Sequence, residues 1–274
     1  MNFKAVQNFV SKDHQEIAGW FFGLDQVIFF ELFSLQNQLG VHGDVCEVGV
    51  YQGKSLVMLS LLKSETDSLV GFDLFEGEDL SKTKENLERY GDPLGVNFVQ
   101  GLTSELSEED LRASLPGPLR FLHIDAGHEY HEVMEQLEIF LPYVSYQGII
   151  AMDDYQDREF PGVEAAVLDM AEIDRPRRFV PFFSGENKMY LCAEAYATPL
   201  QKLILDLSNF KDKCRLTRVR DFNILISSSK LPIASSEIKK QLDELAFPRT
   251  PEHASTGNQK AARYSQLRFG SGNP

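Results

Sequence analysis

The stretch Glu47-Val48-Gly49-Val50-Tyr51-Gln52-Gly53-Lys54-Ser55 decides the fold of this chain. It leaves a short apolar run, Asp44–Gly49, and opens a helical pattern over Ser55–Lys63. Glycines at such a turn let a ligand approach the backbone, and the helix N-terminus that follows favours negative charge. The stretch therefore predicts a ligand-binding loop after the first strand of an α/β domain.

Residues 44–193 continue the alternation of short apolar runs with longer amphipathic ones. The further strand candidates are Leu69–Asp73, Val96–Gln100, Arg120–Asp125 and Gly148–Asp153. The helical patterns between and after them cover Lys82–Tyr90, Glu132–Leu141 and Pro161–Ile173. Strands separated by helices indicate βαβ units and a mostly parallel sheet with both faces covered.

A hairpin is predicted at the end of this region, because Arg178–Ser184 and Lys188–Ala193 flank Gly185-Glu186-Asn187. The predicted fold class is therefore α/β, with a doubly wound, Rossmann-like sheet of seven mostly parallel strands and an antiparallel last strand. Helices precede this sheet and an extension follows it. We expect residues 44–193 to bind the ligand.

Residues 1–43 are expected to form an N-terminal helical segment. Within 16–41, apolar side chains recur at helical spacing at Ile28, Leu32, Leu35 and Leu39. This pattern predicts a helix packed on the core. The aromatic cluster at residues 20–22 before it is also typical of a lid or a subunit contact, so a homo-oligomer stays open.

The chain beyond residue 193 has a looser pattern. Residues 194–248 are expected to pack on the main domain as an elaboration, with helices at Pro199–Phe210 and Glu237–Leu245 and an edge strand at Phe222–Ile226. Residues 249–274 are rich in Gly, Ser, Asn and Gln. They lack the large apolar groups that offset ordering entropy, so a flexible tail is predicted.

Composition excludes several classes of function. The 274 residues carry 27 Lys and Arg against 41 Asp and Glu, a net charge of −14. A protein that binds nucleic acid or an anionic membrane surface needs a surplus of Lys and Arg, which is the opposite charge balance. The three cysteines are widely spaced, no secretory signal is recognisable, and no run of about 20 uncharged apolar residues could span a bilayer. A cytoplasmic protein is expected.

Three classes of ligand use a loop of this kind. A phosphate-binding P-loop needs four residues between its glycines, and here Gly49 and Gly53 enclose three. A dinucleotide loop needs glycine where this chain has Tyr51. The third class is S-adenosylmethionine, whose ammonium and sulfonium groups suit an acidic residue such as Glu47 inside the loop.

At these residues the sequence resembles the class I S-adenosylmethionine-dependent methyltransferases. It is most similar to the branch that contains the macrocin-type sugar O-methyltransferases, methyltransferase domain family 24. The stretch Gly43-Asp44-Val45-Cys46-Glu47-Val48-Gly49-Val50-Tyr51-Gln52-Gly53-Lys54-Ser55 looks like the first motif of that branch, and the resemblance extends over residues 16–193. It implies S-adenosylmethionine as cofactor and a small-molecule acceptor, such as the hydroxyl of a sugar or natural product.

Residues at the strand ends complete the expected cofactor site. Asp73 ends the second strand, where a carboxylate can accept both ribose hydroxyls. The next residues in line, Phe75, Gly101 and Thr103, are expected beside the adenine. The full predicted set is Glu47, Gly49, Tyr51, Gly53, Ser55, Asp73, Phe75, Gly101, Thr103 and Asp125.

Three carboxylates are predicted to share the neighbouring sheet edge. Asp125 follows one strand, and Asp153 and Asp154 follow the next. Carboxylates so placed repel one another unless a cation or a proton intervenes, and oxygen ligands suit Mg²⁺ or Ca²⁺. The resemblance implies the same site, since metal-dependent O-methyltransferases hold a divalent ion at these positions. A divalent cation, with Mg²⁺ as first choice, is therefore expected on Asp125, Asp153 and Asp154.

The catalytic base is expected at His128. The macrocin-type pattern has Asp-Gly-Asp with its second Asp as base, whereas this chain has Asp125-Ala126-Gly127-His128. The predicted function is metal-assisted O-methylation of a small molecule. The alternatives are a metal-independent methyltransferase that uses His128 alone and, from another class, a P-loop-like NTPase or a non-catalytic nucleotide-binding protein.

Overall fold

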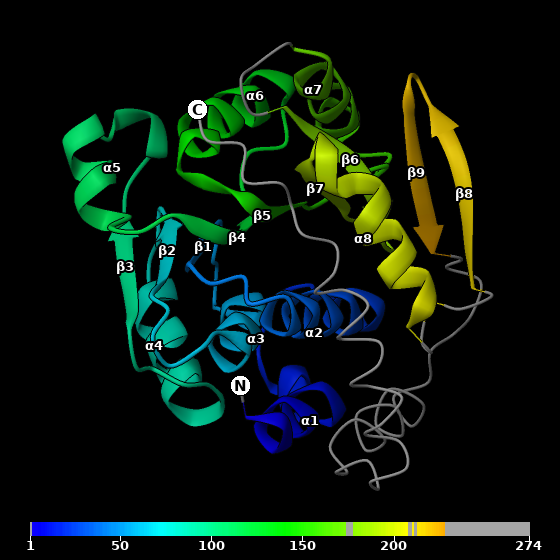
Figure 1. Ribbon diagram of the computed structural model, residues 1–274. Coiled ribbons are helices and arrows are strands. Elements are labelled where there is room, and N and C mark those ends of the chain that lie inside the picture. Colours follow the sequence, from blue (N-terminus) through cyan, green and yellow to red (C-terminus); the bar gives the residue numbers. More distant parts are fainter. Residues whose placement is uncertain (1, 174–177, 208–209, 211–212, 228–274) are drawn as a thin grey trace, which may run out of the picture.

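In the computed structural model, which describes residues 2–173, 178–207, 210 and 213–227, nine strands form one sheet. Their order is β3-β2-β1-β4-β5-β7-β6-β9-β8 (Figure 1). The strands are β1 (Asp44–Val48), β2 (Leu69–Asp73), β3 (Val96–Gln100), β4 (Leu119–Ile124), β5 (Val144–Met152), β6 (Phe179–Ser184), β7 (Met189–Ala193), β8 (Cys214–Val219) and β9 (Phe222–Ser227).

Eight α-helices accompany the sheet within the same described residues. They are α1 (Phe3–Ser11), α2 (Gly23–Gln38), α3 (Lys54–Leu62), α4 (Asp79–Tyr90), α5 (Glu108–Ser114), α6 (Tyr130–Phe140), α7 (Pro161–Glu172) and α8 (Glu194–Asp206). Three short 3-10 helices lie at Asp13–Glu16, Thr103–Glu105 and Leu141–Tyr143. None of the described helices is long and apolar enough to cross a membrane.

The pairing of the strands places the sequence motifs at one edge of the sheet. Strands β3, β2, β1, β4 and β5 run parallel to one another, so their carboxyl ends lie together. Strand β7 lies antiparallel to both β5 and β6, as the predicted hairpin requires. Such a parallel sheet binds ligands at the carboxyl ends of its strands, next to the point where the strand order reverses. In this chain that point lies between β1 and β4.

Helices cover both faces of the sheet. Helices α1 to α4 lie on one side and α5 to α7 on the other (Figure 1). Two clusters of buried apolar side chains correspond to the two faces, one with residues of α1, α2, α3 and α8, the other with residues of α5, α6 and α7. All residues of β4 are buried, and its two polar residues, Arg120 and His123, pair with the buried carboxylates of Asp67 and Glu47.

The N-terminal helix α2 packs on the core. Ile28, Phe29 and Phe33 are fully buried, and the ring of Phe29 meets that of Phe121 of β4 at 5.0 Å. A polar contact adds to this packing, because Gln36 Nε2 donates to the carbonyl of Arg120 at 2.7 Å. The predicted helix within 16–41 is thus confirmed as part of the core, although it begins only at Gly23.

The sheet and the helices differ from the sequence prediction in three respects. The sheet has nine strands, not seven, because the β8–β9 hairpin extends it and β9 pairs with β6 rather than forming the edge. Helix α1 lies within the predicted N-terminal helical segment, although the sequence pattern gives no bounds for it, and helix α5 is not predicted by the sequence. Helix α8 runs from Glu194 to Asp206 and contains Pro199, whereas the sequence pattern predicts a helix over Pro199–Phe210. The predicted helix 237–245 and tail 249–274 lie outside the described residues.

Candidate active site at the carboxyl edge of the sheet

The loop after β1 has a backbone that only glycine permits at its first position. Gly49 has φ +87°, and a Cβ there would lie 1.7 Å from the carbonyl oxygen of Asp125. Its N–H donates to Phe72 O at 2.8 Å. Gly53 has φ +84° and precedes the first turn of α3. The loop after β1 and the loop after β4 are therefore in atomic contact.

Asp73 holds this first loop from the end of β2. Its Oδ2 accepts the N–H groups of Val50 at 2.6 Å and Tyr51 at 2.9 Å, and its Oδ1 accepts that of Phe75 at 2.7 Å. A carboxylate offers about four acceptor sites. Asp73 therefore shapes the loop and keeps acceptor capacity for a ligand hydroxyl.

The other predicted cofactor residues divide by exposure. Gly101 has φ +138° with no atom within 4 Å of its Cβ direction, so this side of the loop is open, and Thr103 is half-buried beside it. Tyr51 is exposed, with φ +50°, and Ser55 is buried in the first turn of α3. Phe75 is only 2% exposed and packs edge-on against Phe98 at 5.7 Å, so its burial does not favour adenine stacking.

Glu47 lies below the loop, inside the sheet. It is fully buried, and its Oε1 is 2.7 Å from Nδ1 of His123 in β4. Its Oε2 has no hydrogen-bond partner among the described residues. In this position Glu47 holds His123, and its carboxylate has no exposed surface to offer a cofactor.

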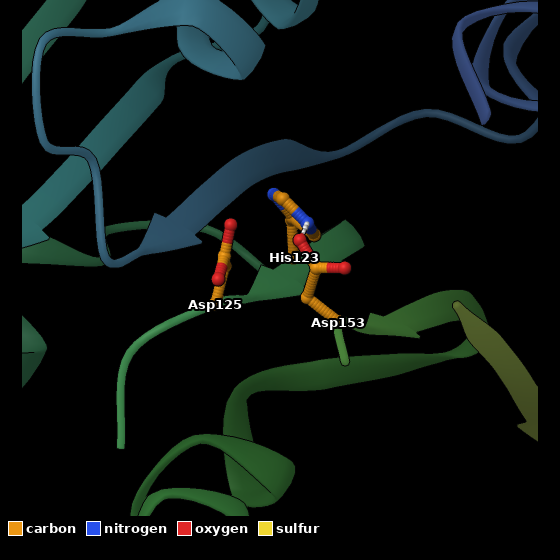
Figure 2. A group of neighbouring side chains, drawn as sticks. All are labelled: His123, Asp125 and Asp153. Atoms are coloured by element: carbon orange, nitrogen blue, oxygen red, sulfur yellow. Dashed lines mark ion pairs between the residues drawn. The ribbon is translucent and has the colours of Figure 1, made fainter. Parts of the chain in front are cut away.

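The three predicted metal ligands are divided between two groups. Potential ligand atoms of His123, Asp125 and Asp153 lie within 4.8 Å of one another, as do those of Asp125, His128 and Asp154. Figure 2 shows the first group at the neighbouring ends of β4 and β5. The strand ends bring them together, because Asp125 N–H donates to Val48 O and Asp153 N–H to Ile124 O. Asp125 thus belongs to both groups, whereas Asp153 belongs only to the first and Asp154 only to the second.

A buried lysine lies beside Asp153. Lys188 is 1% exposed and its Nζ contacts Asp153 Oδ2. Burial opposes the charge on Lys188, but the carboxylates of Asp153, Asp25 and Asp125 outweigh it and raise the lysine pKa above its usual range. Although burial alone would raise the pKa of Asp153, Lys188 holds it well below the usual range.

Asp125 carries the opposite shift. Burial, together with the nearby charge of Asp153, raises the pKa of Asp125 well above its usual range. A protonated Asp125 can donate the hydrogen bond that joins it to Asp153. The sequence predicts a divalent ion to relieve the repulsion among these carboxylates. In the structure, the ammonium group of Lys188 and a proton on Asp125 relieve it instead.

His128 and Asp154 form a pair at the exposed side of the cluster. Nε2 of His128 lies 2.9 Å from Oδ2 of Asp154, and its ring stacks on Phe160 with centroids 4.0 Å apart. Asp154 has φ +52° and donates its N–H to Asp153 Oδ1 at 2.8 Å. Burial and the charge of Asp153 raise the pKa of Asp154. The histidine is oriented by a carboxylate, as in sites that move protons.

Sequence reasoning missed the residues beneath the cluster, namely His123, Lys188, Asp25 and Tyr190. Lys188 follows the predicted turn Gly185-Glu186-Asn187, where a lysine is ordinarily exposed. The available signal is indirect: three carboxylates at one sheet edge need a cation or a proton, and a lysine of the chain itself can supply that cation.

Comparison with known proteins supports this architecture. Residues 46–155 match the family model described as "Methyltransferase domain", methyltransferase family 24. Uncharacterized protein R132 of Acanthamoeba polyphaga mimivirus is 26% identical over 141 residues, which are 50% of this chain and 62% of that protein. The match thus spans less than two thirds of this curated relative.

Solved structures share the fold at low identity. The O-methyltransferase from Bacillus cereus in complex with S-adenosylhomocysteine has a TM-score of 0.50 at 16% identity, covering 69% of this chain and 89% of that one. A putative caffeoyl-CoA O-methyltransferase from Staphylococcus aureus has 0.50 at 15%, covering 70% and 91%. CalS11, a TDP-rhamnose 3'-O-methyltransferase, has 0.48 at 24%, covering 61% and 78%.

Proposed function

We propose that this chain, whose residues 46–155 form a methyltransferase domain, transfers a methyl group from S-adenosylmethionine to a hydroxyl oxygen of a small molecule. One observation carries the proposal. Gly49 of the first loop lies against the Asp125 carbonyl, so a cofactor on that loop would place its methyl group next to the His128–Asp154 pair. Methyl donor and proton acceptor then share one edge of the sheet.

The cofactor would lie along the first loop. Asp73 would bind the ribose with its remaining acceptor capacity, and Gly101 and Thr103 would border the adenine. Gly49, Tyr51, Gly53 and Ser55 would line the methionine portion, with Asp125 at its inner end. Glu47 is proposed in a supporting role through His123, and Phe75 is left out because it is buried.

The sulfonium methyl is reactive without further activation, so the protein has two tasks. It aligns the acceptor oxygen with the methyl carbon, which contributes about 7–11 kcal/mol in favourable cases, and it removes the hydroxyl proton. If Nε2 of His128 donates to Asp154, Nδ1 carries the lone pair and accepts that proton. The imidazolium that forms is stabilised by Asp154.

The residues present do not fit the divalent ion that the sequence predicts on Asp125, Asp153 and Asp154, because Lys188 already neutralises Asp153. We therefore propose transfer without a metal as the first candidate. A second candidate is an ion held by Asp125, His128 and Asp154, whose ligand atoms lie within 4.8 Å of one another. The acceptor class, with sugars included, rests on the sequence resemblance of residues 43–55.

Calorimetric titration with S-adenosylhomocysteine tests the cofactor assignment. We expect wild-type protein to bind it and Asp73→Ala to bind it about 10- to 100-fold more weakly, since hydrogen bonds to a charged group contribute about 1.5–3 kcal/mol. Glu76→Ala, an exposed acid three residues later, is the matched control and should bind normally. Because Asp73 also anchors the loop, the thermal midpoint of each variant is measured alongside.

Binding of ATP in place of S-adenosylhomocysteine would contradict the proposal and favour the NTPase alternative. Equal affinity of the Asp73→Ala and wild-type proteins for S-adenosylhomocysteine would reject only the ribose contact of Asp73, and the cofactor assignment would stand.

A further inference from the structure

We propose that Lys188 is the resident cation of the acid cluster, by which we mean Asp125, Asp153 and Asp154. Its ammonium group takes the place at which the sequence predicts a divalent ion, and Asp153 is therefore unavailable as a metal ligand. The inference concerns the charge at this site and is independent of the methyl-transfer proposal.

The position of Lys188 is fixed by its surroundings. Its carbonyl accepts the N–H of Gly185 at 2.8 Å, which closes the β6–β7 turn. Its Nζ contacts Asp153, and the ring of Phe21 lies 5.7 Å from it. Asp25 of α2 is fully buried nearby and accepts a hydrogen bond from Tyr190 Oη at 3.0 Å. Groups from the end of β5, from the segment before α2 and from α2 itself therefore lie near the ammonium group.

Both oxygens of the Asp153 carboxylate already have partners within the protein. Its Oδ2 is bound by Lys188 and lies 3.9 Å from His123 Nε2, while its Oδ1 accepts the N–H of Asp154. A Mg²⁺ or Ca²⁺ ion needs several oxygen ligands at contact distance. An ion on Asp153 would also lie against the ammonium group, where repulsion between like charges is weakly screened.

Because Lys188 pairs with Asp153 alone, the aspartates of this site fall into two kinds. Asp153 is a buried structural partner, 7% exposed, whereas Asp125 and Asp154 are partly exposed. Removal of the ammonium group should free Asp153 and convert the cluster of His123, Asp125 and Asp153 into a site for a divalent ion.

Mn²⁺ titration of EDTA-dialysed full-length protein, followed by electron paramagnetic resonance, tests this inference. We expect Asp153→Asn to leave Mn²⁺ binding as in the wild type. Lys188→Gln should bind Mn²⁺ roughly tenfold more tightly or better, within the 10–100-fold range by which neighbours of metal ligands change affinity. The double variant Lys188→Gln/Asp153→Asn should lose that gain. Lys188→Arg, which keeps the charge, and Lys82→Gln, at an exposed lysine, should match the wild type.

Two results would overturn the inference: wild-type Mn²⁺ binding that Asp153→Asn weakens, or a Lys188→Gln protein that binds Mn²⁺ no more tightly than the wild type. If Lys188→Gln is too unstable for the titration, the thermal unfolding of Lys188→Gln is compared with that of the double variant Lys188→Gln/Asp153→Asn. A double variant that is folded and more stable than Lys188→Gln supports the charge pairing, and a double variant no more stable than the single one refutes it.

Discussion

His128 presents one ring nitrogen to Asp154 and one face to Phe160, which fixes the ring at the exposed side of the acid cluster. With an acceptor identified by a product heavier by one methylene, we expect His128→Ala to lower kcat by about 10²–10⁴, the usual contribution of a general base. Affinity for S-adenosylhomocysteine should not change. His131→Ala, at an exposed histidine one helical turn later, is the control.

Chelation separates the two candidates for this histidine. As a base, His128 works without a metal, so turnover should persist in EDTA. Turnover that stops in EDTA and returns with Mg²⁺ would favour the ion held by Asp125, His128 and Asp154 instead.

At the scale of single residues, the sequence predicted what lies at strand ends. Asp73, Asp125, Asp153 and Asp154 could be placed because each follows an apolar run directly, and parallel strands bring their carboxyl ends together. The partners of these groups could not be predicted. Glu47 and His123 are 76 residues apart, and no local spacing encodes such a contact. The same holds for Lys188 and Asp153. Because their contact cannot be read from the sequence, the carboxylate of Asp153 is predicted to need a divalent ion.

Among the elements, the segment before α2 bears most directly on the acceptor. The carbonyl of Gly19 accepts a hydrogen bond from Lys54 of α3, and Phe21 packs near Lys188. Trp20 lies between these two anchors and is 83% exposed. The segment thus carries an exposed indole between one anchor on α3 and one beside Lys188, and the lid predicted for this aromatic cluster stays a prediction.

We expect the indole of Trp20 to stack on the acceptor. Trp20→Ala should raise KM for the acceptor roughly three- to tenfold, as the loss of about 0.5–1.5 kcal/mol of stacking would. Binding of S-adenosylhomocysteine should be unaffected, and Phe22→Ala is the control in the same segment. Trp20 is the single tryptophan of the chain, so its fluorescence should also change when acceptor is added to the wild type. Identical KM values and an unchanged emission spectrum would place the acceptor elsewhere.

Helix prediction failed where the sequence pattern is short or mixed. Helix α5 has 7 residues and is largely charged, so it carries little periodicity, although Ser107 and Asp110 form the capping box that signals its start. Helix α8 was placed too late because proline is usual in a first turn. The amphipathic patterns placed α4, α6 and α7 to within a few residues, and the apolar run after Gly53 placed the buried helix α3 equally well.

For the whole molecule, a buried set of charges joins α2 to the sheet. Burial, opposed by Lys188 and reinforced by Asp153, raises the pKa of Asp25 to about 7. A carboxyl group in an unfolded chain titrates near 4, so the folded protein binds the extra proton between these values. Stability from this group is therefore complete at acidic pH, declines as pH rises through the range from about 4 to 7, and is constant above it.

Asp25→Asn, which cannot ionise, should remove this decline. We expect the variant to gain stability relative to wild type between pH 5 and pH 8, by a few kcal/mol at most, because one pKa unit corresponds to about 1.4 kcal/mol. Urea unfolding at both pH values measures the difference. A difference between the two proteins that is the same at pH 5 and pH 8 would show that Asp25 does not titrate in this range.

The architecture was the most predictable level. The alternation of apolar runs and helical patterns gave the parallel strands and the β6–β7 hairpin, and the topology rules for such sheets placed the site at their carboxyl edge. The β8–β9 hairpin was not predicted, since β8 is half-exposed and lacks an apolar run. Its pairing with β6 depends on a contact between segments distant in sequence.

The contact between Gly49 and the Asp125 carbonyl also bears on how this sequence can evolve. Gly40 and Gly49 both have positive φ, +70° and +87°, but no atom lies within 4 Å of the Cβ direction at Gly40. Asparagine tolerates such a backbone, so Gly40 can drift to Asn at little cost. Gly49 cannot, because any side chain would first require the loop after β4 to move. Descendants of this chain are therefore expected to vary at position 40 and to keep glycine at 49 for as long as these two loops stay in contact.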